Sequence, residues 1–364
     1  MSINDIIIYI MAAFAALGAL DKIFGNRFGL GAKFEEGISA IAGVSLAMVG
    51  INSLAPVLGN LLEPVVVPVF QFLGADPAMF AGCFFANDSG AATLAAVLTA
   101  DANAADFAGL IVGSMMGVTV IFTIPISMEM TKKEDQNYVA IGVLAGLVTI
   151  PLGCFVGGIV AGCSAGMVLR NLFPILLLSA LIAVGLWKFQ NVVVKGFTWF
   201  GKIMMGIIIL GLGAGIVETL TGIVIVPGMT PVREGFAIAA DIAMVLSGAY
   251  TLMYVITKVF QKPLLKLGRV FAVNEATIVG MIAAVVNSIP TFGMVKDMNA
   301  RGKVISIAFS VSAAFALGDH LGFTAGYKPE MIAPMIVGKL AGGITAVMVA
   351  LWITRSYRTE EGAL

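Results

Sequence analysis

The chain has 364 residues and no net charge, with 21 Lys and Arg against 21 Asp and Glu. Hydrophobic residues make up 59% of it and charged residues 12%, where a soluble domain carries about 25% charged residues. This composition excludes an ordinary water-soluble globule, and the balanced charge offers no basic surface to nucleic acid. The sequence therefore predicts an all-α polytopic membrane protein in contact with lipid.

Nine apolar segments approach the roughly 20 residues that cross a bilayer as a helix. The first has no basic n-region before it, which favours a membrane helix over a cleaved signal peptide. The nine segments begin near residues 3, 36, 107, 138, 171, 197, 234, 303 and 330.

Two further apolar stretches, 77–100 and 271–294, are interrupted near their middle by "NDSG" (87–90) and "NSIP" (287–290). Such residues favour turns over helix interiors. Both stretches are therefore predicted to be re-entrant hairpins, which enter and leave the membrane by the same face.

The positions of the basic residues favour the hairpins over two additional spans. Cytoplasmic loops are enriched in Lys and Arg, and the clusters lie near 22–33, 132–133, 188–202, 258–269, 296–303 and 355–358. All six clusters share one side only if both interrupted stretches are re-entrant. The same topology places the N-terminus outside.

The chain also repeats itself with an offset of about 200 residues. "FEEGISAIAGVSLAMVG" (34–50) parallels "VREGFAIAADIAMVLSG" (232–248), and "LAGLVT" (144–149) parallels "LAGGIT" (340–345). We expect one transmembrane domain over 1–364, with repeats at about 34–160 and 232–354 and linking helices at about 170–222. The predicted topology makes the repeats inverted, an arrangement typical of secondary transporters.

The first hairpin tip offers the strongest candidate for a binding residue. Asp88 lies where an unpaired charge costs at least a few kcal/mol, and a cationic substrate would offset that cost. Asn87, Ser89, Asn287 and Ser288 add neutral donors and acceptors at the two tips. A purely structural reading is open for each: Asp88 caps a helix, and the others make ordinary turns.

A later stretch, "SAAFALGDHLGF" (312–323), contains Asp319 beside His320, the one histidine of the chain. Two adjacent ionisable groups are costly in lipid, which favours a substrate-binding pair, and glycines on both sides predict local unwinding. An internal hydrogen-bonded pair near the outer interface is the alternative. Asp241, about seven residues into its span, is a further candidate, or it pairs with a neighbouring polar group.

Nothing in the sequence predicts an enzyme, a cofactor or a metal site. One histidine excludes an HExxH pair, and the P-loop and GxSxG patterns are absent. The cysteines, Cys83, Cys154 and Cys163, are an odd number in apolar surroundings, so we expect small buried fillers.

Four stretches are distinctive together: "APVLGNLLEPVVVPVFQFLGADPAMFAG" (55–82), "GVLAGLVTIPLGC" (142–154), "NSIPTFGMVKDMNARGKVI" (287–305) and "SAAFALGDHLGF" (312–323). They resemble the EutH family of ethanolamine utilisation membrane proteins. The resemblance covers nearly the whole chain. It implies a multi-pass protein of the bacterial cytoplasmic (inner) membrane that passes ethanolamine to a cytosolic pathway. With that substrate, Asp88 would hold the ammonium, and Asn87, Asn287 or Ser288 would bind the hydroxyl.

The sequence thus predicts a secondary carrier or facilitator of protonated ethanolamine, and a homodimer is compatible with it. A passive ethanolamine channel and an ion-coupled transporter of another small metabolite are the alternatives. A carrier of anions would need arginine or lysine at the tips, and neither tip has one. A membrane anchor or sensor would need a substantial soluble segment, whereas the predicted loops are short.

Overall fold

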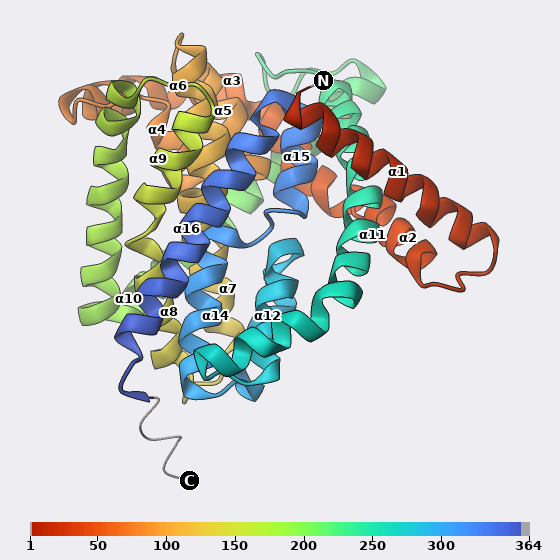
Figure 1. Cartoon of the computed structure of the whole chain (residues 1–364). Helices are drawn as coiled ribbons and strands as arrows, with labels where there is room; N and C mark the ends of the chain where they lie inside the picture. The colour runs from red at the N-terminus through yellow and green to blue at the C-terminus, as the bar shows by residue number, and fades with distance from the viewer. Residues whose placement is uncertain (1, 358–364) are drawn as a thin grey trace.

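The computed structural model describes residues 2–357, without the side chains of 261–262, 264–265, 267 and 269. Arg358 of the last basic cluster, and both ends of the predicted 1–364 domain, lie outside the described residues. Over residues 2–357 the chain is helical and contains no strand (Figure 1). The predicted all-α class is confirmed.

Seven helical segments of the described chain are long and apolar enough to cross a membrane, so a multi-pass membrane protein is confirmed. The seven are Ile3–Ile23, Leu30–Phe72, Ala102–Met130, Gln136–Val160, Ala165–Thr221, Val232–Phe260 and Pro329–Ile353. The helices within these seven segments are α1 (Ile3–Ile23), α2 (Leu30–Ser39), α3 (Ile41–Phe72), α6 (Ala102–Asp106), α7 (Ile124–Met130), α8 (Gln136–Leu147), α9 (Ile150–Val160), α10 (Ala165–Thr221), α11 (Val232–Phe271) and α16 (Ile332–Ile353).

The difference from the nine expected spans has two physical causes. The segments expected at 171 and 197 are two helices that meet at a non-helical residue, Phe189 (φ −138°, ψ 41°); they are labelled together as α10 and so count as one of the seven segments. The segment expected at 303 is divided into α14 (Ala300–Ala313) and α15 (Asp319–Tyr327) by non-helical residues 314–318. Neither half reaches the length of a membrane span.

The first predicted hairpin folds back on itself at its expected tip. Helix α4 (Met79–Phe84) ends before two extended residues, and a single turn, η1 (Asn87–Ser89), precedes α5 (Ala91–Leu98). The Thr99 hydroxyl donates to Asp76 Oδ2 at 2.9 Å, which joins the two ends of the stretch. Its two arms therefore lie side by side.

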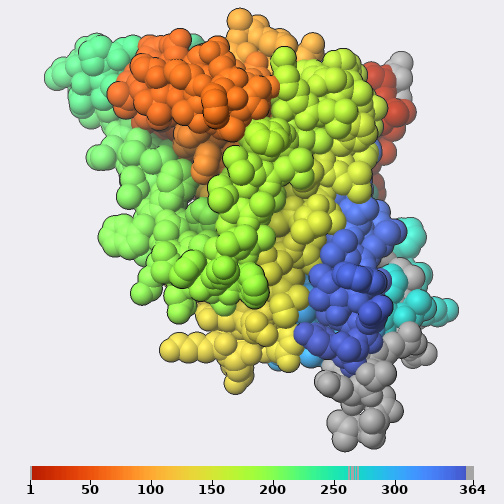
Figure 2. Space-filling model, turned by 90° about the vertical axis from the view of Figure 1, so that its left-hand side faces the viewer, coloured from red at the N-terminus to blue at the C-terminus, as the bar shows by residue number. Residues whose placement is uncertain are grey.

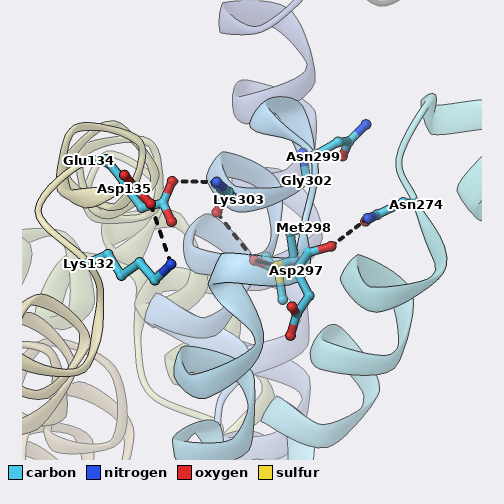
Figure 3. Close-up of polar contacts among 10 residues, drawn as sticks. Lys132, Glu134, Asp135, Asn274, Asp297, Met298, Asn299, Gly302 and Lys303 are labelled. Carbon is cyan, nitrogen blue, oxygen red and sulfur yellow. Dashed lines mark hydrogen bonds and ion pairs between the residues drawn. The ribbon is translucent and has the colours of Figure 1, made fainter.

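The second hairpin has the same construction. Helices α12 (Glu275–Val286) and α13 (Ser288–Met294) meet at Asn287, and the Thr291 hydroxyl donates across the hairpin to the Gly280 carbonyl at 2.7 Å. At its base, Asn274 donates to the Asp297 carbonyl at 2.7 Å (Figure 3). The re-entrant placement of both hairpins in a membrane stays a prediction.

A π-helical segment, η2 (Phe107–Gly117), packs against the first hairpin and is followed by η3 (Thr119–Thr123). The approach is close enough to require glycine. A β-carbon at Gly117 would lie 1.8 Å from the Phe85 carbonyl oxygen. Such π-helical turns concentrate at functional sites, and this one supports the tip that carries Asp88.

The two termini of the described chain lie at opposite ends of the molecule (Figure 1). Near the N-terminus, Asn4 donates to the Glu330 carbonyl at 2.9 Å. At the other end, an ion pair between Lys303 and Asp135 joins the 296–303 cluster to the loop of the 132–133 cluster (Figure 3). These two clusters share one end, as the predicted topology requires.

The outer face of α10 presents large apolar side chains that no other part of the described chain covers. On the face drawn in Figure 2, α10 runs beside α3 and α9. Its exposed side chains include Leu169, Phe173, Leu176, Leu181 and Trp187. A continuous apolar surface of this kind marks contact with lipid or with another protein.

Candidate functional site

A cavity of about 440 Å³ lies where α3, the first hairpin tip, η3, α10 and the start of α15 meet. Most of its lining is apolar, from Gly43 on α3 to Met204 on α10. Its polar and ionisable lining residues are Asp88, Ser89, Asp319 and His320, all from the sequence prediction. A largely apolar pocket with a few converging polar groups is the usual form of a small-molecule site.

Asp88 reaches this cavity because the backbone is extended at Phe85 and Ala86 and turns sharply after η1. Gly90 completes the turn with φ +108°, a conformation that residues with a side chain rarely adopt. The Ser89 hydroxyl donates to Asp88 Oδ1 at 3.0 Å. This neighbour bond fixes one carboxylate oxygen and leaves acceptor capacity for a ligand.

Asp319 begins α15, directly after the non-helical residues 314–318. The bend uses a positive φ of 62° at Phe315, and Gly318 lies so close to α12 that a β-carbon would be 2.0 Å from the Val286 carbonyl oxygen. The Tyr250 hydroxyl of α11 donates to Asp319 Oδ1 at 2.9 Å. The sequence predicts unwinding between Gly318 and Gly322, but the structure unwinds before the pair, at 314–318, and Asp319 and His320 form the first turn of α15 at the cavity.

His320 and the aromatic rings form the other side of the site. His320 is 2% exposed, its ring centre lies 5.2 Å from that of Phe315, and its Nδ1 has no hydrogen-bond partner among the described residues. Phe122 packs edge-on against Phe315 at 5.5 Å, and Phe85 lines the same cavity. Carboxylates and ring faces together suit a small organic cation.

The other predicted site residues do not line this cavity. Asn87 is fully buried, and neither of its side-chain polar atoms has a partner in the described chain. Asn287 caps α13 by accepting from the Ile289 amide at 2.9 Å, while Ser288 is buried behind it. Asp241 is exposed on α11. Substrate roles for these four residues stay predictions.

A second cavity, of about 230 Å³, shares α3 and α15 with the first and adds α5 and α11. It is lined by Asn52 of α3, Thr93 of α5 and Tyr327 of α15, together with Glu234 at the start of α11. Both polar atoms of the Asn52 side chain are buried without a partner among the described residues. In α3 and in the first hairpin, the residues of the second cavity follow those of the first in sequence.

Sequence reasoning missed three of the residues around these cavities: Lys339, Tyr250 and Asn52. Lys339 is 0% exposed, and its ammonium donates to the Ser114 carbonyl oxygen at 2.5 Å. A single lysine in the middle of the last apolar segment, "IAPMIVGKLAGG" (332–343), is the signal that could have found it, because such residues are costly in a span. Tyr250 and Asn52 stand in segments with no comparable signal.

Comparison with known proteins agrees with the resemblance seen in the sequence. Over 363 residues the chain is 56% identical to the "Probable ethanolamine permease EutH" of Listeria monocytogenes, covering 100% of this chain and 97% of that protein. It is 46% identical to the "Uncharacterized protein YxeR" of Bacillus subtilis, covering 99% and 98%. It is 43% identical to the "Probable ethanolamine permease EutH" of Escherichia coli, covering 97% and 96%.

No solved structure matches the chain. The family model described as "Ethanolamine utilisation protein, EutH" matches residues 3–353, which include both hairpins and every residue of the two cavities. The chain therefore belongs to the EutH family of ethanolamine utilisation proteins.

Proposed function

We propose that this protein carries protonated ethanolamine across the bacterial cytoplasmic (inner) membrane, as a secondary carrier or facilitator. One observation supports the proposal most directly: Asp88 and Asp319, from segments over 200 residues apart, line the same mainly apolar cavity. Two carboxylates in such surroundings attract a cation, since unbalanced buried charge is costly.

Ethanolamine fits this chemistry at both of its ends. Its primary ammonium is almost wholly cationic near neutral pH, like that of lysine, so lipid excludes it. The carboxylates of Asp88 and Asp319 can accept from the ammonium, and the phenyl rings of Phe122 and Phe315 can lie against it. Ser89 and His320 then remain for the hydroxyl.

The two cavities support alternating access over an open pore. In α3 they are separated by Ile51, which is fully buried, and a β-carbon at Gly90 would lie 2.3 Å from Ile51 Cγ1. This tight contact between α3 and the hairpin tip lies between the two sets of cavity residues in α3. A carrier needs such a contact to separate and reform as access changes sides.

The predicted inverted repeats gain support from the helices that follow the two hairpins, because both helices are irregular. The helix after the first hairpin is π-helical over Phe107–Gly117, and the helix after the second is unwound at 314–318. With the offset of about 200 residues seen in the sequence, 314–318 overlaps the end of the π-helical segment. Broken helices at matching positions of two repeats point to a transport site.

The test is uptake of labelled ethanolamine by purified protein in liposomes. Asp88→Asn keeps the shape and removes the charge, so we expect uptake to fall by about 100-fold, as loss of a charge-assisted hydrogen bond implies. Glu63→Gln, on an exposed part of α3, is the matched control and should transport normally. Undiminished uptake by an Asp88→Asn protein that assembles like the unmodified one contradicts the proposal.

A further inference from the structure

Lys339 is a buried cation that takes no part in the proposed substrate site. It lies near the middle of the apolar segment Pro329–Ile353 and is completely excluded from solvent. Its ammonium donates to one carbonyl oxygen, that of Ser114, at 2.5 Å. A carbonyl satisfies one donor but cannot balance a positive charge, and an unbalanced charge at this depth is costly.

The position of Ser114 links Lys339 to the cation site. Ser114 belongs to η2, the π-helical segment that supports the first hairpin tip through Gly117 and Phe85. Gly113 of the same segment also lies against the turn that carries Asp88, because a β-carbon there would be 3.2 Å from the Asn87 amide nitrogen. One element therefore contacts both Lys339 and the Asp88 turn, and the charge of Asp88 partly offsets that of Lys339.

Other ionisable groups around Asp88 and Lys339 come from α9, α11 and α15. Cys154 of α9 acts on Lys339, and Lys339 acts on His320 of α15. Asp319 of α15, held by Tyr250 of α11, acts on Asp88. Lys339 is the one ammonium in this group of residues. A substrate ammonium that binds Asp88 therefore arrives beside a like charge in a medium of low dielectric constant.

We propose that Lys339 makes this transporter a cation–proton exchanger: binding of the substrate ammonium at Asp88 expels one proton from Lys339, and release of the substrate restores it. This inference rests on the proposed function. In the step, one N–H bond of the Lys339 ammonium breaks, its electron pair stays on Nζ, and the proton passes to water on the side from which the substrate came. The neutral amine keeps its hydrogen bond to the Ser114 carbonyl.

The exchange fixes what moves across the membrane in one cycle. One ammonium ion enters and one proton leaves, so the net transfer is that of a neutral amine and carries no charge. The membrane potential then neither drives nor opposes uptake. A uniporter of the cation behaves differently, because the potential would concentrate its substrate.

The experiment uses proteoliposomes that contain a pH-sensitive dye and accept a potassium diffusion potential set by valinomycin. For the unmodified protein, we expect added ethanolamine to make the lumen alkaline, faster than in liposomes with Asp88→Asn, which report leakage of the free amine. An inside-negative potential should change accumulation less than about twofold. Potential-driven accumulation without alkalinisation would overturn the exchange and leave the proposed function standing, whereas uptake no faster than the leak would remove both.

Two lysine variants assign the proton. Lys339→Met should convert transport to a potential-driven mode, in which an inside-negative potential raises accumulation more than about tenfold. Lys328→Met is the matched control, since Lys328 is a partly exposed lysine paired with Asp106 at 2.5 Å, and it should keep electroneutral exchange. If Lys339→Met also stays electroneutral, another group carries the proton and the assignment is wrong. Lys339→Arg is the second variant: it keeps the positive charge but cannot release a proton, so it should lose electroneutral exchange, and electroneutral exchange retained by it would overturn the assignment.

Discussion

The carboxylates of Asp88 and Asp319 face the same cavity but are held in different ways. Asp88 accepts from Ser89, its neighbour in the η1 turn, so its orientation is set locally. Asp319 accepts from Tyr250 on α11, so its orientation depends on the packing of α11 against α15. A movement of α11 relative to α15 would therefore disturb Asp319 and spare Asp88.

Replacing Tyr250 tests this dependence. Tyr250→Phe removes the hydroxyl but keeps the ring, and loss of a hydrogen bond to a charged group is worth about 1.5–3 kcal/mol. We expect the KM for ethanolamine uptake to rise by about tenfold, because Asp319 loses its fixed orientation. Tyr254→Phe, one turn further along α11, is the control and should leave KM unchanged. An unchanged KM in Tyr250→Phe would separate Asp319 from substrate binding.

The sequence predicts a site residue only where a polar side chain interrupts an apolar stretch. Asp88, Asp319 and His320 stood out because each interrupts an apolar stretch, and the structure brings all three to one cavity. Tyr250 carries no such contrast, since tyrosine is common in membrane segments. Its importance arises from a partner 69 residues away, which no local pattern shows.

At the scale of elements, the two hairpins behave differently although their sequences predict the same construction. Both break at the expected positions, but only the first tip lines the cavity. The second lies behind residues 314–318, whose amides at Phe315 and Leu317 donate to the carbonyls of Ala284 and Val285 at 2.9 Å. Turn-forming residues predicted where each helix breaks. They could not predict which tip another segment would cover.

The contact between η2 and the first hairpin gives a prediction at this scale. Gly117→Ala places a methyl group against the Phe85 carbonyl, where the backbone cannot yield without moving the Asp88 turn. Overpacking of this kind costs about 1–3 kcal/mol. We expect a lower melting temperature and a loss of uptake greater than the loss of folded protein.

The control for this variant is Gly213→Ala on α10, where nothing lies within 4 Å of the added carbon. Because alanine favours helix over glycine by about 1 kcal/mol, the control should be as stable as the unmodified protein or more so. Thermal unfolding in detergent and uptake in liposomes measure the two effects. Equal behaviour of the two variants would show that η2 does not hold the tip in place.

At the scale of the whole molecule, hydropathy predicted the membrane class but not the number of continuous helices. A window of apolar residues cannot show that "AFALG" (314–318) leaves the helix, because that region stays apolar. The break at Phe189 is different, since Lys188, Gln190 and Lys195 interrupt the apolar sequence around it. The inverted repeats and the orientation of the chain in the membrane stay predictions.

The arrangement of the two cavities gives the most general prediction. If the contact of Ile51 with Gly90 opens and closes access alternately, substrate should expose one cavity while it closes the other. Single cysteines at Val44, in the first cavity, and Thr93, in the second, can report this through their rates of maleimide labelling. The natural cysteines are all buried, so their background labelling should be low.

We expect saturating ethanolamine to change the two labelling rates in opposite directions, each by about twofold or more, because it shifts the population between two states. The same cysteines in an Asp88→Asn background provide the control, since a protein that cannot bind the ammonium should show no shift. A passive channel would raise both rates together, because its path opens at both ends at once. Parallel changes at Val44 and Thr93 would therefore replace the carrier with a channel, and would leave the carboxylates of the first cavity as its selectivity site.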